Sequence, residues 1–234
     1  MASFTTTNLS DDFTVHIQEK PSLAILPSEV LAQIESIWNE EQQKRGQFLF
    51  NGKILNHISH DSHHLVGHFV EYKHYLAQLR DPTLRPFLPI QGVGMTGVTF
   101  AENHVLMGRR ASHVTSYPNK LEFAPAGGVD ADYVENDLFL LNKALLSELH
   151  EEVGYNTNAV ESLQPFALIS EPHINHWEIC TRIILKPHQK DLLTPTSPEY
   201  SEIFWLPINT LNSFFDQHAN DIIPMSRFIE RVIS

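Results

Sequence analysis

The sequence has a single cysteine, Cys180, among its 234 residues. One thiol excludes an internal disulfide framework and any cysteine-based zinc site, and it is typical of a reducing compartment. Basic residues are also few, because 16 Lys and Arg stand against 28 Asp and Glu and leave a net charge of -12. This balance argues against a nucleic-acid polymer as partner, since phosphate backbones are bound mainly by clustered Lys and Arg.

Long apolar runs are missing as well. No stretch reaches membrane-spanning length, and the N-terminal MASFTTTNLSDDF lacks the basic and apolar regions of a signal peptide. We therefore expect a cytoplasmic protein with no membrane partner. Fourteen histidines invite a metal hypothesis. However, the dense HDSHH segment lacks the H-E-x-x-H arrangement and cysteine partners, so a histidine-based metal site is disfavoured.

Residues 1–88 predict an N-terminal α+β extension. PSEVLAQIESIWNEEQQKRG has apolar residues at helix spacing, with Ser28 as the N-cap and Gly46 as the stop. QFLFNGKIL predicts a hairpin that bends at Asn51-Gly52, and HLVGHFVEYKHYLAQL predicts a strand that leads into a short helix. The three prolines of DPTLRPFLP are typical of a connector to the second part of the chain.

Residues 89–234 predict alternating strands and helices. QGVGMTGVTFAENHVLMGRR indicates two strands around a turn at Glu102-Asn103, and NKLEF indicates another before a proline-and-glycine loop. A helix follows, then the β-rich runs LQPFALISEP and HWEICTRIILK, then a strand that passes into a helix at Pro207. A last helix is expected near PMSRFIERVI. This order predicts an α/β or α+β fold.

The helix within LLNKALLSELHEEVGY carries the most informative cluster. Glu148, Glu151 and Glu152 lie three and four residues apart, so on a helix their like charges repel. They also stand at the helix C-terminus, where the macrodipole favours cations, and Gly154 suits the left-handed position that ends the helix. A solvated surface face is one interpretation, and a bound metal ion is the other.

The apolar side of the same helix should face a sheet. At 100° per residue its stripe consists of Leu138, Leu145, Leu149 and Val153, and the glutamates are roughly a right angle away. Two starts of the helix fit the sequence. Asp132 and Glu135 have the spacing of a capping box, whereas Asn136 or Asp137 would cap a shorter helix.

Together with the upstream glycines, this segment resembles the signature of the Nudix hydrolase family, G-x5-E-x7-R-E-U-x-E-E-x-G-U, where U is apolar. SELHEEVGY matches its second half, and the pair Gly127-Gly128 stands where the signature opens. The flanking VLMGRRASHVTSYPNKLEFAPAGG and EYSEIFWLPINTL also look like the family's strands and closing helix. The resemblance covers roughly residues 90–234 and implies a mixed β-sheet between helices.

The sequence departs from the signature in two places. Ser147 stands where the family has Arg, so the hydrogen bonds that would orient Glu148 are missing or come from another residue. The interval from Gly128 to Glu148 is about five residues longer than the signature allows, and the first Glu of the signature has only Glu135 and Asp137 as candidates.

The resemblance implies hydrolysis of a diphosphate with Mg²⁺ or Mn²⁺, which are hard cations that prefer oxygen ligands. Glu148, Glu151 and Glu152 would be the catalytic and metal-binding acids, with the carbonyl of Gly127 as a further ligand. Arg109 and Arg110 are expected to hold substrate phosphate, although a surface ion pair is the alternative for them. A further loop acid is implied, with four candidates: Glu171, Glu178, Glu199 and Glu202.

The substrate implied is a small nucleoside diphosphate derivative. WNE, LFNGKIL and Tyr72-Lys73 in the N-terminal region are similar to the Nudix subgroup that splits UDP-glucose and UDP-galactose into UMP and a sugar 1-phosphate. ADP-ribose or a dinucleotide is the alternative substrate. A noncatalytic nucleotide-binding sensor on the same scaffold is the alternative function, because a fold does not dictate function. The sequence leaves a homodimer open.

Overall fold

The computed structural model describes residues 3–19, 26–46, 49–190, 193 and 197–233. The strands in chain order are β1 (Thr5–Asn8), β2 (Thr14–Ile17), β3 (Lys53–His60), β4 (His64–Glu71), β5 (Gly92–Ala101), β6 (His104–Arg110), β7 (Leu121–Phe123), β8 (Ala126–Gly128), β9 (Val134–Glu135), β10 (Leu138–Phe139), β11 (Val160–Glu171), β12 (His176–Leu185) and β13 (Tyr200–Pro207). The α-helices are α1 (Ser28–Arg45), α2 (Tyr72–Arg80), α3 (Leu141–Glu148), α4 (Leu211–Gln217) and α5 (Pro224–Ile233).

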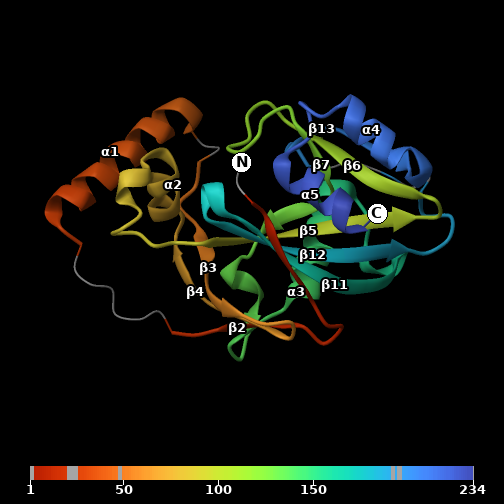
Figure 1. Cartoon of the computed structure of the whole chain (residues 1–234), viewed down its shortest axis with the longest axis horizontal. Helices are drawn as coiled ribbons and strands as arrows, with labels where there is room; N and C mark the ends of the chain where they lie inside the picture. The colour runs from red at the N-terminus through yellow and green to blue at the C-terminus, as the bar shows by residue number, and fades with distance from the viewer. Residues whose placement is uncertain (1–2, 20–25, 47–48, 191–192, 194–196, 234) are drawn as a thin grey trace.

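The strands form one mixed sheet in the order β1-β11-β12-β5-β3-β4-β2-β10-β9, with β6, β7, β8 and β13 attached through β5 and β6. The parallel pair β12 and β5 is its centre, and β11 and β3 flank that pair in antiparallel register. Helices lie on both sides of this centre, with α4 and α5 on one side and α3 on the other (Figure 1). The expected mixed sheet between helices is confirmed.

Two buried apolar clusters fix these helices against the sheet. On one face, Leu145 and Leu149 pack with Met95 and Ile179. On the other face, Phe215 of α4 and Ile229 of α5 pack with Phe123 and Val98. Because Leu145, Leu149 and Val153 are fully buried, the apolar stripe expected on the carboxylate helix is confirmed at these three positions. It holds that helix in place beside the sheet.

The N-terminal elements are hydrogen-bonded into the same sheet. Strand β1 pairs with β11, and β3 pairs with β5 through Leu55 and Asn56. Helices α1 and α2 pack on each other at one end of the molecule (Figure 1). The division at residue 88 stays a prediction. No helix in the described ranges is long and apolar enough to cross a membrane.

Several element boundaries agree with the sequence, and three details do not. Helix α1 has the expected span, but Ser28 is its first residue and Pro27 occupies the cap position. The strand expected before Asn51-Gly52 is wrong, because residues 49–52 have no strand assignment and β3 pairs with β4 instead; residues 47–48 lie outside the described residues.

Both proposed starts of the carboxylate helix are also wrong. Residues Ala131–Tyr133 form a 3-10 turn, and Asn136 and Asp137 take positive φ values of 50° and 62° at the turn between β9 and β10. The helix begins only at Leu141. Leu138 therefore belongs to β10 and pairs with His16 of β2, so it is not part of the helix stripe.

Candidate active site

The three glutamates lie at the end of α3 and in the π-helical turn that continues it, Leu149–Val153. This wider turn ends at Gly154, which has a φ of 88° and thus fills the left-handed position expected from the sequence. π-turns within helices are frequent at functional sites. Here the turn leaves Glu152 buried and Glu151 exposed.

Glu152 and Glu148 approach the backbone of β8. The backbone N–H of Ala126 donates a hydrogen bond to Glu152 Oε2 at 3.0 Å, and the Glu152 side chain is only 3% exposed. A Cβ atom at Gly127 would overlap the carboxyl group of Glu148. Gly127 therefore allows the backbone and the Glu148 carboxyl group to approach closely. The sequence predicts the Gly127 carbonyl as a metal ligand beside these acids.

This crowding makes the charged forms of both carboxyl groups unfavourable. Burial, with help from the charges of Glu151, Glu199 and Asp130, raises the pKa of Glu148 to about 7. Burial and the charge of Glu148 raise the pKa of Glu152 well above its ordinary value. The two acids thus form a compact pair whose repulsion a cation would relieve.

Glu151 lies on the exposed side of the turn. Its Oε1 accepts a hydrogen bond from Ser147 Oγ at 2.7 Å, an i, i+4 contact along the helix. Ser147, which replaces the arginine of the signature, therefore orients Glu151 rather than Glu148. The two candidates for the first signature acid lie elsewhere, because Glu135 pairs with Lys143 and Asp137 occupies the β9–β10 turn.

Of the four loop acids, Glu199 is the one whose charge acts on both Glu148 and Glu152. It is exposed and directly precedes β13. Glu171 and Glu178 belong to a separate buried group on β11 and β12, where Glu178 accepts from Thr96 Oγ1 at 2.6 Å. Glu202 pairs with Arg109. Sequence position alone left these acids equivalent, because their distances from the helix depend on strand pairing.

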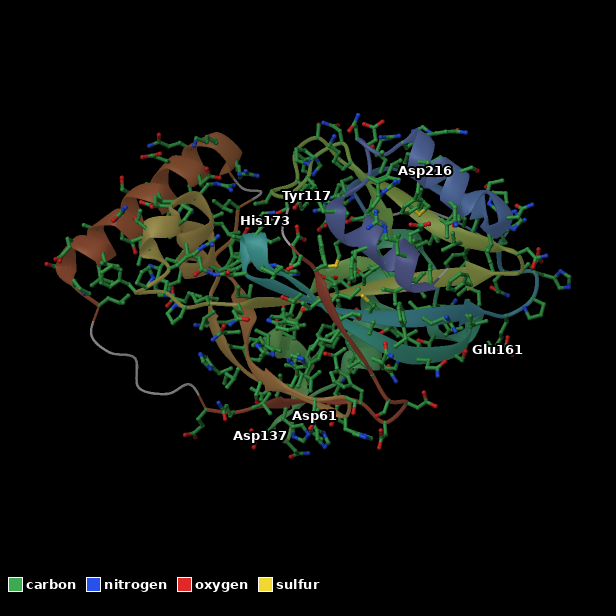
Figure 2. All side chains as sticks on the ribbon, in the orientation of Figure 1. Asp61, Tyr117, Asp137, Glu161, His173 and Asp216 are labelled. Carbon is green, nitrogen blue, oxygen red and sulfur yellow. The ribbon has the colours of Figure 1, made fainter. Side chains whose placement is uncertain are left out.

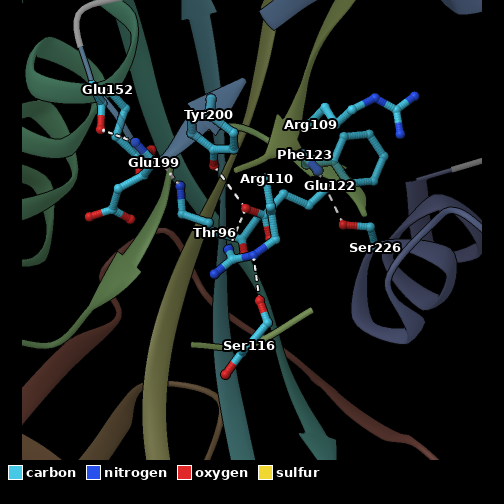
Figure 3. A network of polar contacts seen from close by, with 12 residues as sticks. Thr96, Arg109, Arg110, Ser116, Glu122, Phe123, Glu152, Glu199, Tyr200 and Ser226 are labelled. Atoms are coloured by element: carbon cyan, nitrogen blue, oxygen red, sulfur yellow. Dashed lines mark hydrogen bonds and ion pairs between the residues drawn. The ribbon is translucent and has the colours of Figure 1, made fainter. Parts of the chain in front are cut away.

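The two arginines point to opposite sides of β6. Arg109 Nε donates to Glu202 Oε2 at 3.4 Å, and Figure 3 shows its side chain directed away from Glu152. Arg110 Nη1 donates to Glu122 Oε1 at 2.6 Å, and its Nε donates to the carbonyl of Ser116. Substrate binding by either arginine stays a prediction.

Arg110 belongs to a buried polar network that the sequence did not indicate. Tyr200 Oη donates to the same Glu122 oxygen at 3.0 Å (Figure 3). Burial raises the pKa of Glu122, although Arg110 and Tyr200 act in the opposite direction. Glu122 alternates with buried Leu121 and Phe123, and strand alternation assigns such a polar residue to a solvated face just as readily. No signal in the sequence distinguishes the two cases.

The donors present fit a hard divalent cation chemically. Among the described residues, no three His, Cys, Asp or Glu side chains already surround a common metal position. Mg²⁺, however, usually keeps several waters and binds through one or two carboxylates together with substrate phosphates. Glu148 and Glu152 supply that number, and the exposed Glu151 and Glu199 are close enough to act on Glu148 electrostatically.

Comparisons with known proteins found only distant structural similarity. No family model matches the chain, and no curated protein matches it. Solved structures resemble part of it. DR0079 from Deinococcus radiodurans is 16% identical, with a TM-score of 0.44 over 59% of this chain and 80% of that one. A NUDIX hydrolase from Nitrosomonas europaea is 23% identical, with a TM-score of 0.42 over 59% and 68%.

A third similar structure is a bifunctional NMN adenylyltransferase/ADP ribose pyrophosphatase from Francisella tularensis. It is 13% identical, with a TM-score of 0.46 over 69% of this chain and 47% of that one. Because these TM-scores lie below 0.5, we base the function on the residues of the site itself.

Proposed function

We propose that this chain is a Nudix-type hydrolase that cleaves the diphosphate linkage of a nucleoside diphosphate derivative with the help of Mg²⁺ or Mn²⁺. The observation that supports this most is the pair formed by buried Glu152 and half-buried Glu148, which packs against the Ala126–Gly127 backbone. A pair of repelling carboxylates destabilises the fold unless it binds a cation or takes up a proton, and the raised pKa values of Glu148 and Glu152 reflect their burial and the charges of neighbouring carboxylates. The match of SELHEEVGY to the family signature agrees with this assignment.

Each residue then has a defined task. A bound divalent cation neutralises the diphosphate oxygens and makes a water molecule a better nucleophile. Glu152 and Glu148 would hold it, with the Gly127 carbonyl as a backbone ligand. Glu151, which Ser147 orients, and Glu199 would complete the ligand set or accept the proton of the attacking water. Arg109 and Arg110 are kept as proposed phosphate contacts.

We propose a nucleotide sugar such as UDP-glucose as substrate, with UMP and glucose 1-phosphate as products. Support comes from the sequence of the N-terminal region, whose helices lie close to the β6–β7 loop. Arg45 Nη1 of α1 donates to the carbonyl of Val114 at 3.5 Å, and Figure 2 shows Tyr117 of this loop at the junction with the N-terminal helices. ADP-ribose and dinucleotides remain the alternative substrates.

Assays that detect the products of diphosphate cleavage, such as UMP and glucose 1-phosphate, test this proposal directly. The purified chain would be incubated with UDP-glucose, ADP-ribose, NADH or nucleoside triphosphates, each with Mg²⁺, with Mn²⁺ and with EDTA. We expect metal-dependent cleavage, fastest with UDP-glucose. Faster cleavage of ADP-ribose would correct the substrate alone. No turnover of any compound would overturn the hydrolase assignment, and nucleotide binding without turnover would favour the sensor.

A further inference from the structure

We infer that Arg110, Glu122 and Tyr200 are positioning residues that hold Glu199 beside the carboxylate pair. This inference rests on the proposed function for its catalytic consequence, but its effect on metal binding can be measured separately. Within the described part of the chain, none of the three is hydrogen-bonded to Glu148 or Glu152. The charge of Glu122 also acts directly on Glu152, but the position of Glu199 depends on the backbone that joins it to Tyr200.

The Tyr200 side chain is held at its hydroxyl and along one edge of its ring. Its hydroxyl donates to Glu122 Oε1 at 3.0 Å, and Arg110 Nη1 donates to that same oxygen at 2.6 Å. The ring lies over Gly108, where an added Cβ atom would come within 2.5 Å of it. Tyr200 and Glu122 are 8% and 3% exposed, so neither side chain can exchange its partner for bulk water without local rearrangement.

The backbone transmits this position to Glu199. Tyr200 pairs with Arg110 across the β13–β6 ladder, and the N–H of Ala111 donates to the carbonyl of Glu199 at 2.7 Å. A register shift follows between Tyr200 and Glu202. Bulges of this kind redirect a side chain or end a pairing. Glu199 therefore precedes the first anchored residue of β13, and Figure 3 shows it between Glu152 and Tyr200.

The composition of the network favours positioning over simple stability. A buried ion pair contributes little net stability, since desolvation offsets its attraction, and apolar side chains of similar volume often replace it without loss. What a fully bonded buried pair does provide is a defined geometry. Here the defined geometry is that of Tyr200, which directly follows Glu199 in the sequence. Glu199 is the one loop acid of the four candidates whose charge acts on both Glu148 and Glu152.

Tyr200→Phe is the decisive variant because it removes only the hydroxyl. Tyr75→Phe is its matched control, since Tyr75 is 7% exposed and its hydroxyl donates to the carbonyl of Ile174 at 3.0 Å. Mn²⁺ binding would be measured by calorimetric titration without nucleotide, together with kcat, KM and the melting temperature. Gly108→Ala is a second variant, which should displace the ring while keeping every polar group.

We expect Tyr200→Phe to weaken Mn²⁺ binding and lower kcat by about tenfold each, as is typical when an outer partner of a metal site is lost. KM for the nucleotide should change little. Tyr75→Phe should lower the melting temperature about as much as Tyr200→Phe does, yet keep the Mn²⁺ affinity of the parent. Gly108→Ala should resemble Tyr200→Phe.

Equal Mn²⁺ affinities for Tyr200→Phe and the parent would overturn the inference. Equal losses of Mn²⁺ affinity in Tyr200→Phe and Tyr75→Phe would overturn it as well. Failure of the proposed function looks different. In that case the parent would turn over no substrate, while the Mn²⁺ titrations would still separate Tyr200→Phe from its control and support the positioning role.

Discussion

At the scale of single residues, Gly127 sets how closely the backbone and the acidic helix can approach. An added Cβ would overlap the Glu148 carboxyl group, whereas a Cβ at the adjacent Gly128 meets nothing within 4 Å. Neither glycine has a positive φ. Substitution of either one by alanine is therefore compatible with the backbone, and only the space around the Cβ differs.

We predict that Gly127→Ala lowers kcat by at least about tenfold, because it displaces a carboxylate on which the site depends. Gly128→Ala should retain nearly full activity. Steady-state assays of both variants, with melting temperatures as a check on folding, make the comparison. Equal activities of the two variants would show that the close approach at Gly127 has no role in the reaction.

Glu152→Gln separates charge from shape in the same site. The amide keeps the volume of the side chain and can still accept from Ala126 N–H, but it carries no negative charge for a cation. We predict a fall in kcat of at least about 100-fold, since charge neutralisation by the metal contributes several kcal/mol. The melting temperature without metal should stay equal or rise, because a repelling charge is removed.

Glu161→Gln is the control for this change. Glu161 is exposed on β11, and Figure 2 shows it near the edge of the molecule. Its variant should match the parent in both activity and melting temperature. Parental activity in Glu152→Gln would mean that Glu152 is not a metal ligand.

At the scale of elements, the packing of α1 on α2 depends on one buried acid. Glu41 accepts from Lys44 at 3.2 Å, from Arg45 at 3.1 Å and from Arg80 of α2 at 3.1 Å, and it is 4% exposed. The hydrogen bond from Arg80 contributes most to lowering the pKa of Glu41 to about 2. A lowered pKa in the folded state stabilises the protein above the ordinary pKa, and this contribution is lost as the pH falls through the folded value.

We therefore predict that Glu41→Gln lowers the free energy of unfolding by about 1–3 kcal/mol at pH 7. The difference from the parent should narrow as the pH falls from about 5 toward about 2. Glu35→Gln on the same helix is the control, because the pair of Glu35 with Lys73 is half exposed and should contribute less than about 1 kcal/mol. Urea unfolding across this pH range measures both. A difference that is constant with pH would contradict the role of the Glu41 charge.

The elements that the sequence predicts well are those whose own residues determine them. Helix period over residues 28–45 gives α1, and the buried stripe Leu145, Leu149 and Val153 follows from the same rule. The sequence misplaces the start of α3 because Asp and Asn side chains, which suit a helix cap, also suit a tight turn. Asn136 and Asp137 form the turn of the β9–β10 hairpin, and β10 also pairs with β2, which is far away in the sequence.

The site itself was only partly predictable for a related reason. The three helix acids are visible because they are neighbours in the sequence. The choice of Glu199 and the network around Glu122 depend on the pairing of β13 with β6 and of β6 with β7. A motif carries no information about such long-range contacts, so residue type alone could not rank the candidate acids.

At the scale of the whole molecule, a net charge of -12 opposes any anionic substrate. Binding of such a substrate requires local positive charge, and in the proposed function a divalent cation would supply most of it. We predict that removal of metal by EDTA abolishes binding of the proposed nucleotide substrate, and that Mg²⁺ restores it. Equilibrium dialysis measures this directly. Undiminished binding in EDTA would mean that Lys and Arg side chains, and not a metal ion, bind the nucleotide.

The most direct test of the account is a titration of Mn²⁺ into the parent and into Glu152→Gln, with free Mn²⁺ followed by electron paramagnetic resonance. We predict saturable binding by the parent, loss of that binding in Glu152→Gln, and parental binding in Glu161→Gln. No binding by the parent, or identical curves for the parent and Glu152→Gln, would contradict the claim that Glu152 and Glu148 form a metal site.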